Sequence, residues 1–167
     1  KLFLKVNRKK TEVSHISKVK YLGYSFYRYK GKCRFRVHSK SVVKMKNRIR
    51  ELTDRNKGIS NEVREKKYQE YVRGWVEYFR LADMKKLLQK TDEWARRRIR
   101  AIYWKQWKKI KTKCRMLKAL GLEDWKAKEL ANSRKGYWRM AKVLNQIFSN
   151  KIIAKLGYTS FLDYYLI

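Results

Sequence analysis

Most of the residues in this chain that could do chemistry are cations. The 167 residues include 46 lysines and arginines against 14 aspartates and glutamates, a formal net charge of +32. A chain of this size with such an excess repels itself, and a polyanion relieves the repulsion. We expect that polyanion to be nucleic acid, because each phosphate contact releases condensed counterions. No run of about 18 apolar residues is present, so we expect no membrane partner.

The carboxylates are mostly explained without catalysis. Metal-dependent phosphoryl chemistry needs carboxylates that converge on two metal ions. Several carboxylates here stand where helices are expected to begin, a position the helix dipole favours: Glu62, Asp92, Glu93, Glu123 and Asp124. Asp83 stands alone, and the two histidines and two cysteines have no metal-ligand spacing. We therefore expect no catalytic residue, no metal ligand and no cofactor in this chain.

The composition indicates a folded, helical protein rather than a basic tail. Aromatic residues make up 14% and apolar residues 44% of the chain, which is enough to bury a core. Proline is absent and only 7 residues are glycine, a composition that suits long helices. We expect a mostly α fold with strands at its N-terminus, as one domain or one domain plus a piece of another.

The first 38 residues have the pattern of β-strands. Residues 1–7 alternate apolar and polar side chains, and residues 19–29 are rich in β-formers. Lys30-Gly31 can turn the chain back into a strand over residues 33–37, with its apolar and basic residues on opposite faces. Arg34 and Arg36 would lie about 6.6 Å apart on the basic face. We expect both to contact phosphate.

Helical periodicity begins at Ser39. Ser39 or Ser41 can cap a first helix, whose apolar stripe is Val42, Met45, Ile49 and Leu52. Ser60 can cap a second helix, whose stripe is Tyr68, Tyr71, Val72, Trp75, Tyr78 and Phe79. A glycine in a helix costs about 1 kcal/mol relative to alanine. Gly74 in the second helix therefore indicates that another segment packs close to it.

A third helical region covers about 83–108, and Thr91-Asp92-Glu93 could start a new helix inside it. Arg96, Arg97 and Arg100 lie largely off its apolar stripe, so we expect them to face solvent or phosphate. Shorter amphipathic segments follow at 114–120, 123–131, 137–148 and 151–156. We expect the aromatic segment 161–167 to pack back on the fold.

The candidate RNA contacts are cations on the basic strand, the helices and a lysine-rich connector: Arg34, Arg36, Lys44, Arg48, Arg96, Arg97, Arg100, Lys105, Lys108, Lys109, Lys111, Lys113, Arg134, Lys135 and Arg139. Any one of them could instead be an ordinary solvated charge. Trp104 and Trp107 lie among lysines, so we expect them to contact bases or riboses. Aromatics at helical spacing are more often core, and we expect that of Trp75, Trp94 and Trp138.

Four segments of the chain have distinctive motifs: Tyr21-Leu22-Gly23-Tyr24-Ser25-Phe26, Arg73-Gly74-Trp75-Val76-Glu77-Tyr78-Phe79, residues 92–109, and Ala131-Asn132-Ser133-Arg134-Lys135-Gly136-Tyr137-Trp138-Arg139. All four resemble motifs of one family, the bacterial group II intron reverse transcriptases. The first resembles the primer grip at the end of the palm. The others resemble the thumb, also called the maturase or X domain. The resemblance covers nearly the whole chain, in order and at similar spacing.

The resemblance implies two regions and two tasks. Residues 1–38 would be the end of the palm, and residues 39–167 the helical thumb and maturase domain. The chain would bind group II intron RNA to promote splicing and retrohoming, and would clamp the RNA template–DNA primer duplex during DNA synthesis. We expect it to act in a ribonucleoprotein particle in the bacterial cytoplasm.

The same resemblance implies missing parts. The metal-binding aspartates of the parent polymerase, which would use Mg²⁺, lie upstream of the segments found here. We therefore expect a piece of a longer protein that is inactive alone, with the fingers and palm as a possible partner.

Two alternatives remain open on the sequence. One is a structural RNA-binding protein with no enzymatic parent, such as a ribosome-associated factor, although the hairpin that resembles a primer grip argues against it. The other is an enzyme whose active site the sequence pattern does not reveal. An assay for divalent-metal-dependent activity would distinguish them.

Overall fold

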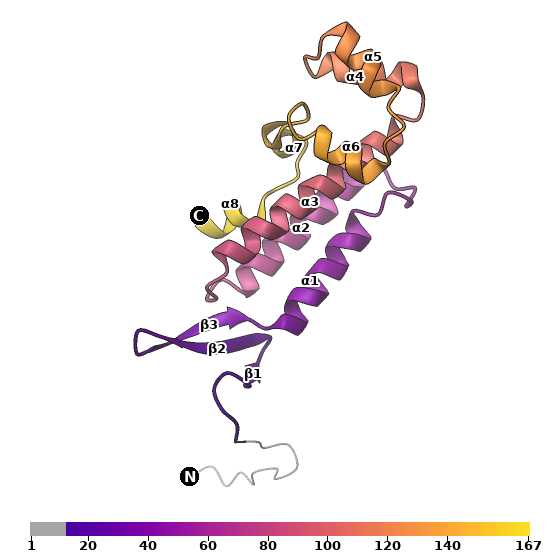
Figure 1. The fold of residues 1–167 in the computed structure, drawn as a ribbon. Helices are drawn as coiled ribbons and strands as arrows, with labels where there is room; N and C mark the ends of the chain where they lie inside the picture. The colour runs from indigo at the N-terminus through magenta and orange to yellow at the C-terminus, as the bar shows by residue number, and fades with distance from the viewer. Residues whose placement is uncertain (1–12) are drawn as a thin grey trace.

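A computed structural model describes residues 13–167, and the strand expected for residues 1–7 lies outside them. A small antiparallel sheet in the order β1-β2-β3 precedes a helical body (Figure 1), which confirms the expected fold class. The strands are β1 (Lys20–Tyr21), β2 (Tyr24–Tyr29) and β3 (Lys32–Val37). The helices are α1 (Ser39–Leu52), α2 (Asn61–Tyr78), α3 (Lys85–Gln106), α4 (Ile110–Ala119), α5 (Asp124–Ala131), α6 (Tyr137–Val143), α7 (Asn150–Lys155) and α8 (Phe161–Leu166).

Two tight turns shape the sheet. Lys30 and Gly31 both have positive φ, 48° and 76°, as two-residue hairpin turns of type I′ require. The expected hairpin is therefore confirmed, with Phe26 opposite Phe35 in its register. Leu22 and Gly23 also have positive φ, 49° and 84°, between β1 and β2. The segment that resembles a primer grip is thus a second hairpin.

This second hairpin is attached to the first two helices. The Gly23 carbonyl accepts hydrogen bonds from the His38 N–H (2.9 Å) and the Ser41 hydroxyl (3.0 Å). The Tyr78 hydroxyl of α2 donates to the Leu22 carbonyl at 3.0 Å. His38 Nδ1, rather than Ser39 or Ser41, caps α1 by accepting from the Lys40 N–H. Ser41 instead fastens the hairpin, which corrects its expected role.

The third helical region is one continuous helix, so the expectation of a new helix start at residues 91–93 is wrong. Asp92 instead caps α8: its carboxylate accepts from the Ser160 hydroxyl at 2.7 Å and from the Phe161 and Leu162 N–H groups, each at 2.9 Å. Asp92 therefore does cap a helix, but that helix begins nearly seventy residues further along the chain. Ser60 caps α2 as expected.

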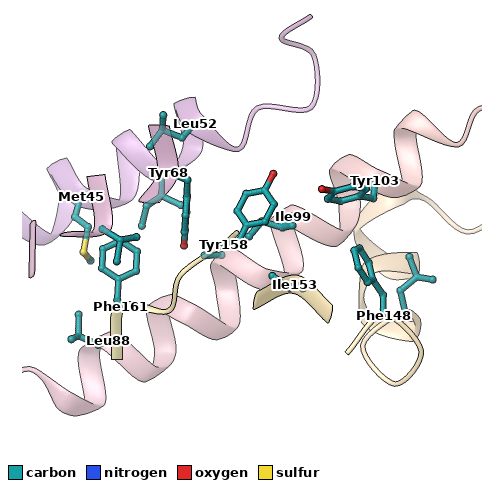
Figure 2. Packing of buried hydrophobic residues seen from close by; sticks show 14 of the residues in the cluster. Met45, Leu52, Tyr68, Leu88, Ile99, Tyr103, Phe148, Ile153, Tyr158 and Phe161 are labelled. Atoms are coloured by element: carbon teal, nitrogen blue, oxygen red, sulfur yellow. The ribbon is translucent and has the colours of Figure 1, made fainter. Parts of the chain in front are cut away.

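The core lies between α1, α2, α3 and the C-terminal segment (Figure 2). Phe161 of α8 is fully buried and packs edge-on against Tyr68 and Trp75 of α2, at 6.1 and 5.9 Å between ring centroids. The aromatic C-terminal segment therefore packs back as expected, although its last two residues are exposed. Gly74 does not show the expected close packing, because a Cβ there would meet no atom within 4 Å.

The helices α4 and α5 pack on each other and project from one end of the helical body (Figure 1). Leu117 and Ala127, both fully buried, lie in their contact. The described residues include no helix that is both long and apolar enough to cross a membrane.

Candidate nucleic-acid interface

The arginine run of α3 divides into buried and accessible members. Arg100 is only 3% exposed, and its Nε donates to the Phe148 carbonyl at 2.8 Å while Nη2 donates to Asn150 Oδ1 at 2.7 Å. Burial, and then the neighbouring charge of Arg96, lower the pKa of Arg100 to about 10. The expectation that Arg100 faces solvent is wrong, since it anchors the segment between α6 and α7. Arg96 and Arg97 are half-buried.

Trp104 and Trp107 are also buried, at 2% and 7% exposed. Their rings pack edge-on at 6.0 Å, and Trp107 lies 6.4 Å from the ring of Phe148. The expectation that they present rings to a base is therefore wrong, because the chain after α6 covers them. Lys113 lies over the Trp104 ring at 4.6 Å, so one face of this indole carries a cation.

The prediction for Trp138 was wrong in the other direction: the side chain was expected in the core but is 40% exposed. The Arg97 guanidinium lies 4.0 Å from the centre of its ring. Arg97 Nε and Nη2 also donate to the Trp138 carbonyl, at 3.2 and 3.0 Å. The neighbouring Tyr137 is 41% exposed and has Arg55 over its ring at 5.0 Å. Arginine and exposed aromatic rings therefore alternate where α6 begins.

Arg98 completes this arrangement, although it is not among the RNA contacts predicted from the sequence. Its Nε donates to the Thr53 hydroxyl at 2.7 Å, and its Nη2 donates to the Thr53 and Arg50 carbonyls. Burial, and then the charges of Arg50 and Arg55, lower the pKa of Arg98, whereas Asp54 raises it. Membership in the run 96–98 was the available signal. We call Arg55, Arg97, Arg98, Tyr137 and Trp138 the α3–α6 surface.

A buried arginine orders the loop that carries Arg55. Arg64 of α2 is 1% exposed, and its guanidinium donates to Asn61 Oδ1 and to the carbonyls of Asp54 and Lys57. The loop between α1 and α2 is thereby tied to the helical body at two of its carbonyls. Arg55 is consequently presented from an anchored loop.

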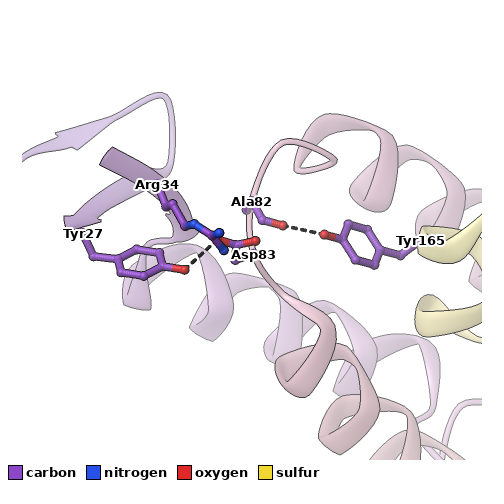
Figure 3. A network of polar contacts seen from close by, with 5 residues as sticks. All are labelled: Tyr27, Arg34, Ala82, Asp83 and Tyr165. Atoms are coloured by element: carbon purple, nitrogen blue, oxygen red, sulfur yellow. Dashed lines mark hydrogen bonds and ion pairs between the residues drawn. The ribbon is translucent and has the colours of Figure 1, made fainter. Parts of the chain in front are cut away.

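Two of the predicted cations are paired with carboxylates. Arg34 of β3 lies 3.5 Å from the Asp83 carboxylate, which also accepts from the Tyr27 hydroxyl at 2.6 Å (Figure 3). Asp83 therefore does not stand alone, because it fastens the sheet to the turn between α2 and α3. Tyr165 of α8 donates to the adjacent Ala82 carbonyl from the other side. Arg48 pairs with Glu51 at 2.8 Å on the exposed face of α1.

The remaining predicted contacts are mostly exposed. Lys105 and Lys113 are half-buried, and the Lys105 ammonium donates to Asn56. The others are exposed: Arg36, Lys44, Lys108, Lys109, Lys111, Arg134, Lys135 and Arg139. Arg134, Lys135 and Arg139 flank the exposed rings of Tyr137 and Trp138, so they extend the positive charge of the α3–α6 surface.

This arrangement suits a polyanion with exposed bases. Stacked arginines keep their charge while offering flat faces, and aromatic rings stack on nucleobases. Among residues 13–167, no three histidine, cysteine or carboxylate side chains gather as a metal site would require.

A search of curated proteins found no match to this chain. A family model does match: residues 42–121 match the group II intron, maturase-specific domain. The matched segment runs from α1 to just beyond α4, and includes Arg55, Arg97 and Arg98 of the α3–α6 surface. The match therefore supports a maturase domain in this chain, and such domains are associated with group II intron RNA.

Proposed function

We propose that this chain binds group II intron RNA and stabilises its folded, splicing-competent form, so that it promotes splicing and retrohoming. The α3–α6 surface and the exposed cations around it make the contact. The same helices clamp an RNA template–DNA primer duplex, and the hairpin of Tyr21–Phe26 acts as the primer grip. On this proposal residues 1–38 are the end of a palm, residues 39–167 are a thumb and maturase domain, and the particle resides in the bacterial cytoplasm.

The observation that carries the proposal is that several arginines inside the matched segment form no ion pair with a carboxylate. None of the ion pairs formed among residues 13–167 involves Arg55, Arg97 or Arg98. Two of these arginines lie over exposed aromatic rings. Arg55 and Arg97 are neither paired with carboxylates, as Arg34 and Arg48 are, nor buried as internal anchors, as Arg64 and Arg100 are. Unpaired arginines beside exposed rings instead favour a nucleic acid partner.

The test is binding to a folded group II intron RNA, compared with an unrelated structured RNA of equal length, at physiological ionic strength. We expect tighter binding to the intron RNA. Replacing Arg134, Lys135 and Arg139 together by glutamine should weaken that binding. A matched control replaces Lys85, Lys86 and Lys90 near the start of α3 by glutamine, which removes the same charge from exposed side chains that form none of the ion pairs among residues 13–167.

The control variant should bind the intron RNA more tightly than the variant beside α6. Equal weakening by the two variants would mean that net charge alone attracts the RNA. Equal affinity of the wild type for the two RNAs would contradict the proposal that intron RNA is the partner.

A further inference from the structure

A cleft opens within the α3–α6 surface. It has a volume of about 380 Å³, and its walls come from the loop Thr53–Asn56, from Arg98 and Ala101 of α3, and from Trp138 of α6. This volume falls in the range of sites that hold small molecules, about 300–1,000 Å³. The lining is mainly polar, apart from the indole of Trp138 and the methyl group of Ala101. The cleft thus combines one flat apolar wall with groups that bind anions or form hydrogen bonds.

The apolar wall is held rigidly in place. Arg97 both stacks on the Trp138 ring and donates two hydrogen bonds to the Trp138 carbonyl, so it fixes the side chain and the backbone together. An indole that is already fixed loses little conformational entropy when a second flat group stacks on it. Trp125 on α5 is a useful comparison, because it is 61% exposed and carries Lys126 over its ring, yet it lines none of this cleft.

The opposite walls carry positive charge. Arg98 is fixed by three hydrogen bonds to Thr53 and Arg50, and Arg55 extends from the loop that Arg64 anchors. Asp54 is the carboxylate in the lining, so the two arginines leave the cleft with a net charge of +1 (two cations minus one anion). Arg50 adds a further charge nearby. The loop amide of Asn56 supplies a neutral hydrogen-bonding group beside these cations.

We infer that this cleft holds one unpaired nucleotide of the bound RNA, with its base stacked on Trp138 and its phosphate against Arg55 and Arg98. The inference rests on the proposed RNA binding and adds the kind of RNA feature that is recognised. A base inside a duplex has both faces covered by its neighbours, so only a bulged or looped nucleotide can stack on a protein ring. The phosphate of the same nucleotide would then lie within reach of the cations on the facing walls.

The experiment compares three RNAs of one sequence by fluorescence anisotropy: a perfect duplex, the same duplex with one bulged nucleotide, and the same bulge with an abasic residue. Stacking on an aromatic side chain contributes about 1–3 kcal/mol per base, and the middle of this range corresponds to about 30-fold in affinity. We expect the wild type to prefer the base-containing bulge over both other RNAs by about that factor.

Trp138→Ala should abolish this preference, so that the variant binds the three RNAs with affinities within about twofold of one another, because the stacked base is lost. Trp138→Phe should keep part of the preference. The control Trp125→Ala, which removes a more exposed indole outside the cleft, should keep all of it. Melting curves of the variants show whether the fold is intact.

Each outcome decides the matter. If Trp138→Ala keeps the preference, or loses duplex and bulge binding equally, the nucleotide is not in this cleft. If the abasic bulge binds as well as the complete one, the base does not stack there. If the wild type binds all three RNAs equally, RNA binding stands and the inference fails. If it binds neither these RNAs nor intron RNA, the proposed function itself fails.

Discussion

At the scale of single residues, the tryptophans show what sequence neighbours cannot reveal. Trp104 and Trp107 lie among lysines, yet both are buried, because Phe148 from the segment between α6 and α7 packs against Trp107, whose ring packs against that of Trp104. Trp138 also lies among basic residues, yet it is 40% exposed. The charge of adjacent residues says little about exposure on a helix, since adjacent side chains point about 100° apart. Only the distant covering segment decides it.

Alanine variants of Arg100 and Arg96 should differ in stability, because Arg100 is a buried anchor and Arg96 is only half-buried. Arg100→Ala removes the buried donor to the Phe148 carbonyl and Asn150, and leaving buried acceptors unsatisfied costs about 1–3 kcal/mol. Arg96→Ala, one turn earlier and half-buried at the edge of a cleft, should change stability much less. Urea unfolding of both variants measures the difference. Equal stabilities of the two variants would contradict the structural role of Arg100.

Tyr158 gives a pH-dependent test at the same scale. Burial, followed by the charge of Glu65, raises the pKa of this hydroxyl from 10.0 to about 12. Between pH 10 and 12 the folded chain therefore holds a proton that the unfolded chain releases. The stability that this protonated hydroxyl contributes is present below pH 10 and is lost as the pH rises toward 12. The free energy of unfolding of Tyr158→Phe should therefore fall less than that of the wild type between pH 9 and pH 11. Urea unfolding measured in steps of ~1 pH unit follows both proteins across this range.

The comparison cancels the titration of the lysines, which the two proteins share. Parallel stability curves for wild type and variant across this pH range would show that the hydroxyl is not protected from ionisation.

At the scale of elements, periodicity predicted most of the fold. The turn at Lys30-Gly31, the cap at Ser60 and the buried stripe of α1 are all local features, and the structure confirms them. Asp92 was assigned to the wrong helix, because a capping carboxylate in the sequence does not show which helix end it reaches in space. The α3–α6 surface was predicted only in part, since Arg55 and Arg98 become site residues through contacts between α1, α3 and α6.

Gly23 and Gly74 make a matched pair at this scale. Gly23 has φ of +84°, and a Cβ there would lie 3.0 Å from the Ser41 hydroxyl. Gly23→Ala should therefore destabilise the chain by about 1–3 kcal/mol. Gly74 lies inside α2 with open space around it, so Gly74→Ala should stabilise by about 0.5–1 kcal/mol. Thermal unfolding measures both, and shifts of the same sign would contradict this account of the two glycines.

At the scale of the whole molecule, the net charge of +32 favours a polyanion as partner, whereas the fold decides where that charge is concentrated. The fold buries Arg64 and Arg100 as internal anchors, and it pairs Arg34 and Arg48 with carboxylates. The arginines stacked on aromatic rings beside α6 and the exposed lysines after α3 remain accessible to a polyanion. Charge alone predicts affinity, and this distribution predicts where the RNA binds.

The measurement that tests the central claim most directly is the salt dependence of binding to folded group II intron RNA. If on the order of six phosphates are neutralised, the logarithm of the association constant should fall against the logarithm of salt concentration with a slope of about −4 or steeper. A steep slope would show that the protein binds through released counterions, as this account predicts. A flat plot would contradict it, because the uncompensated cations would then contribute nothing to recognition.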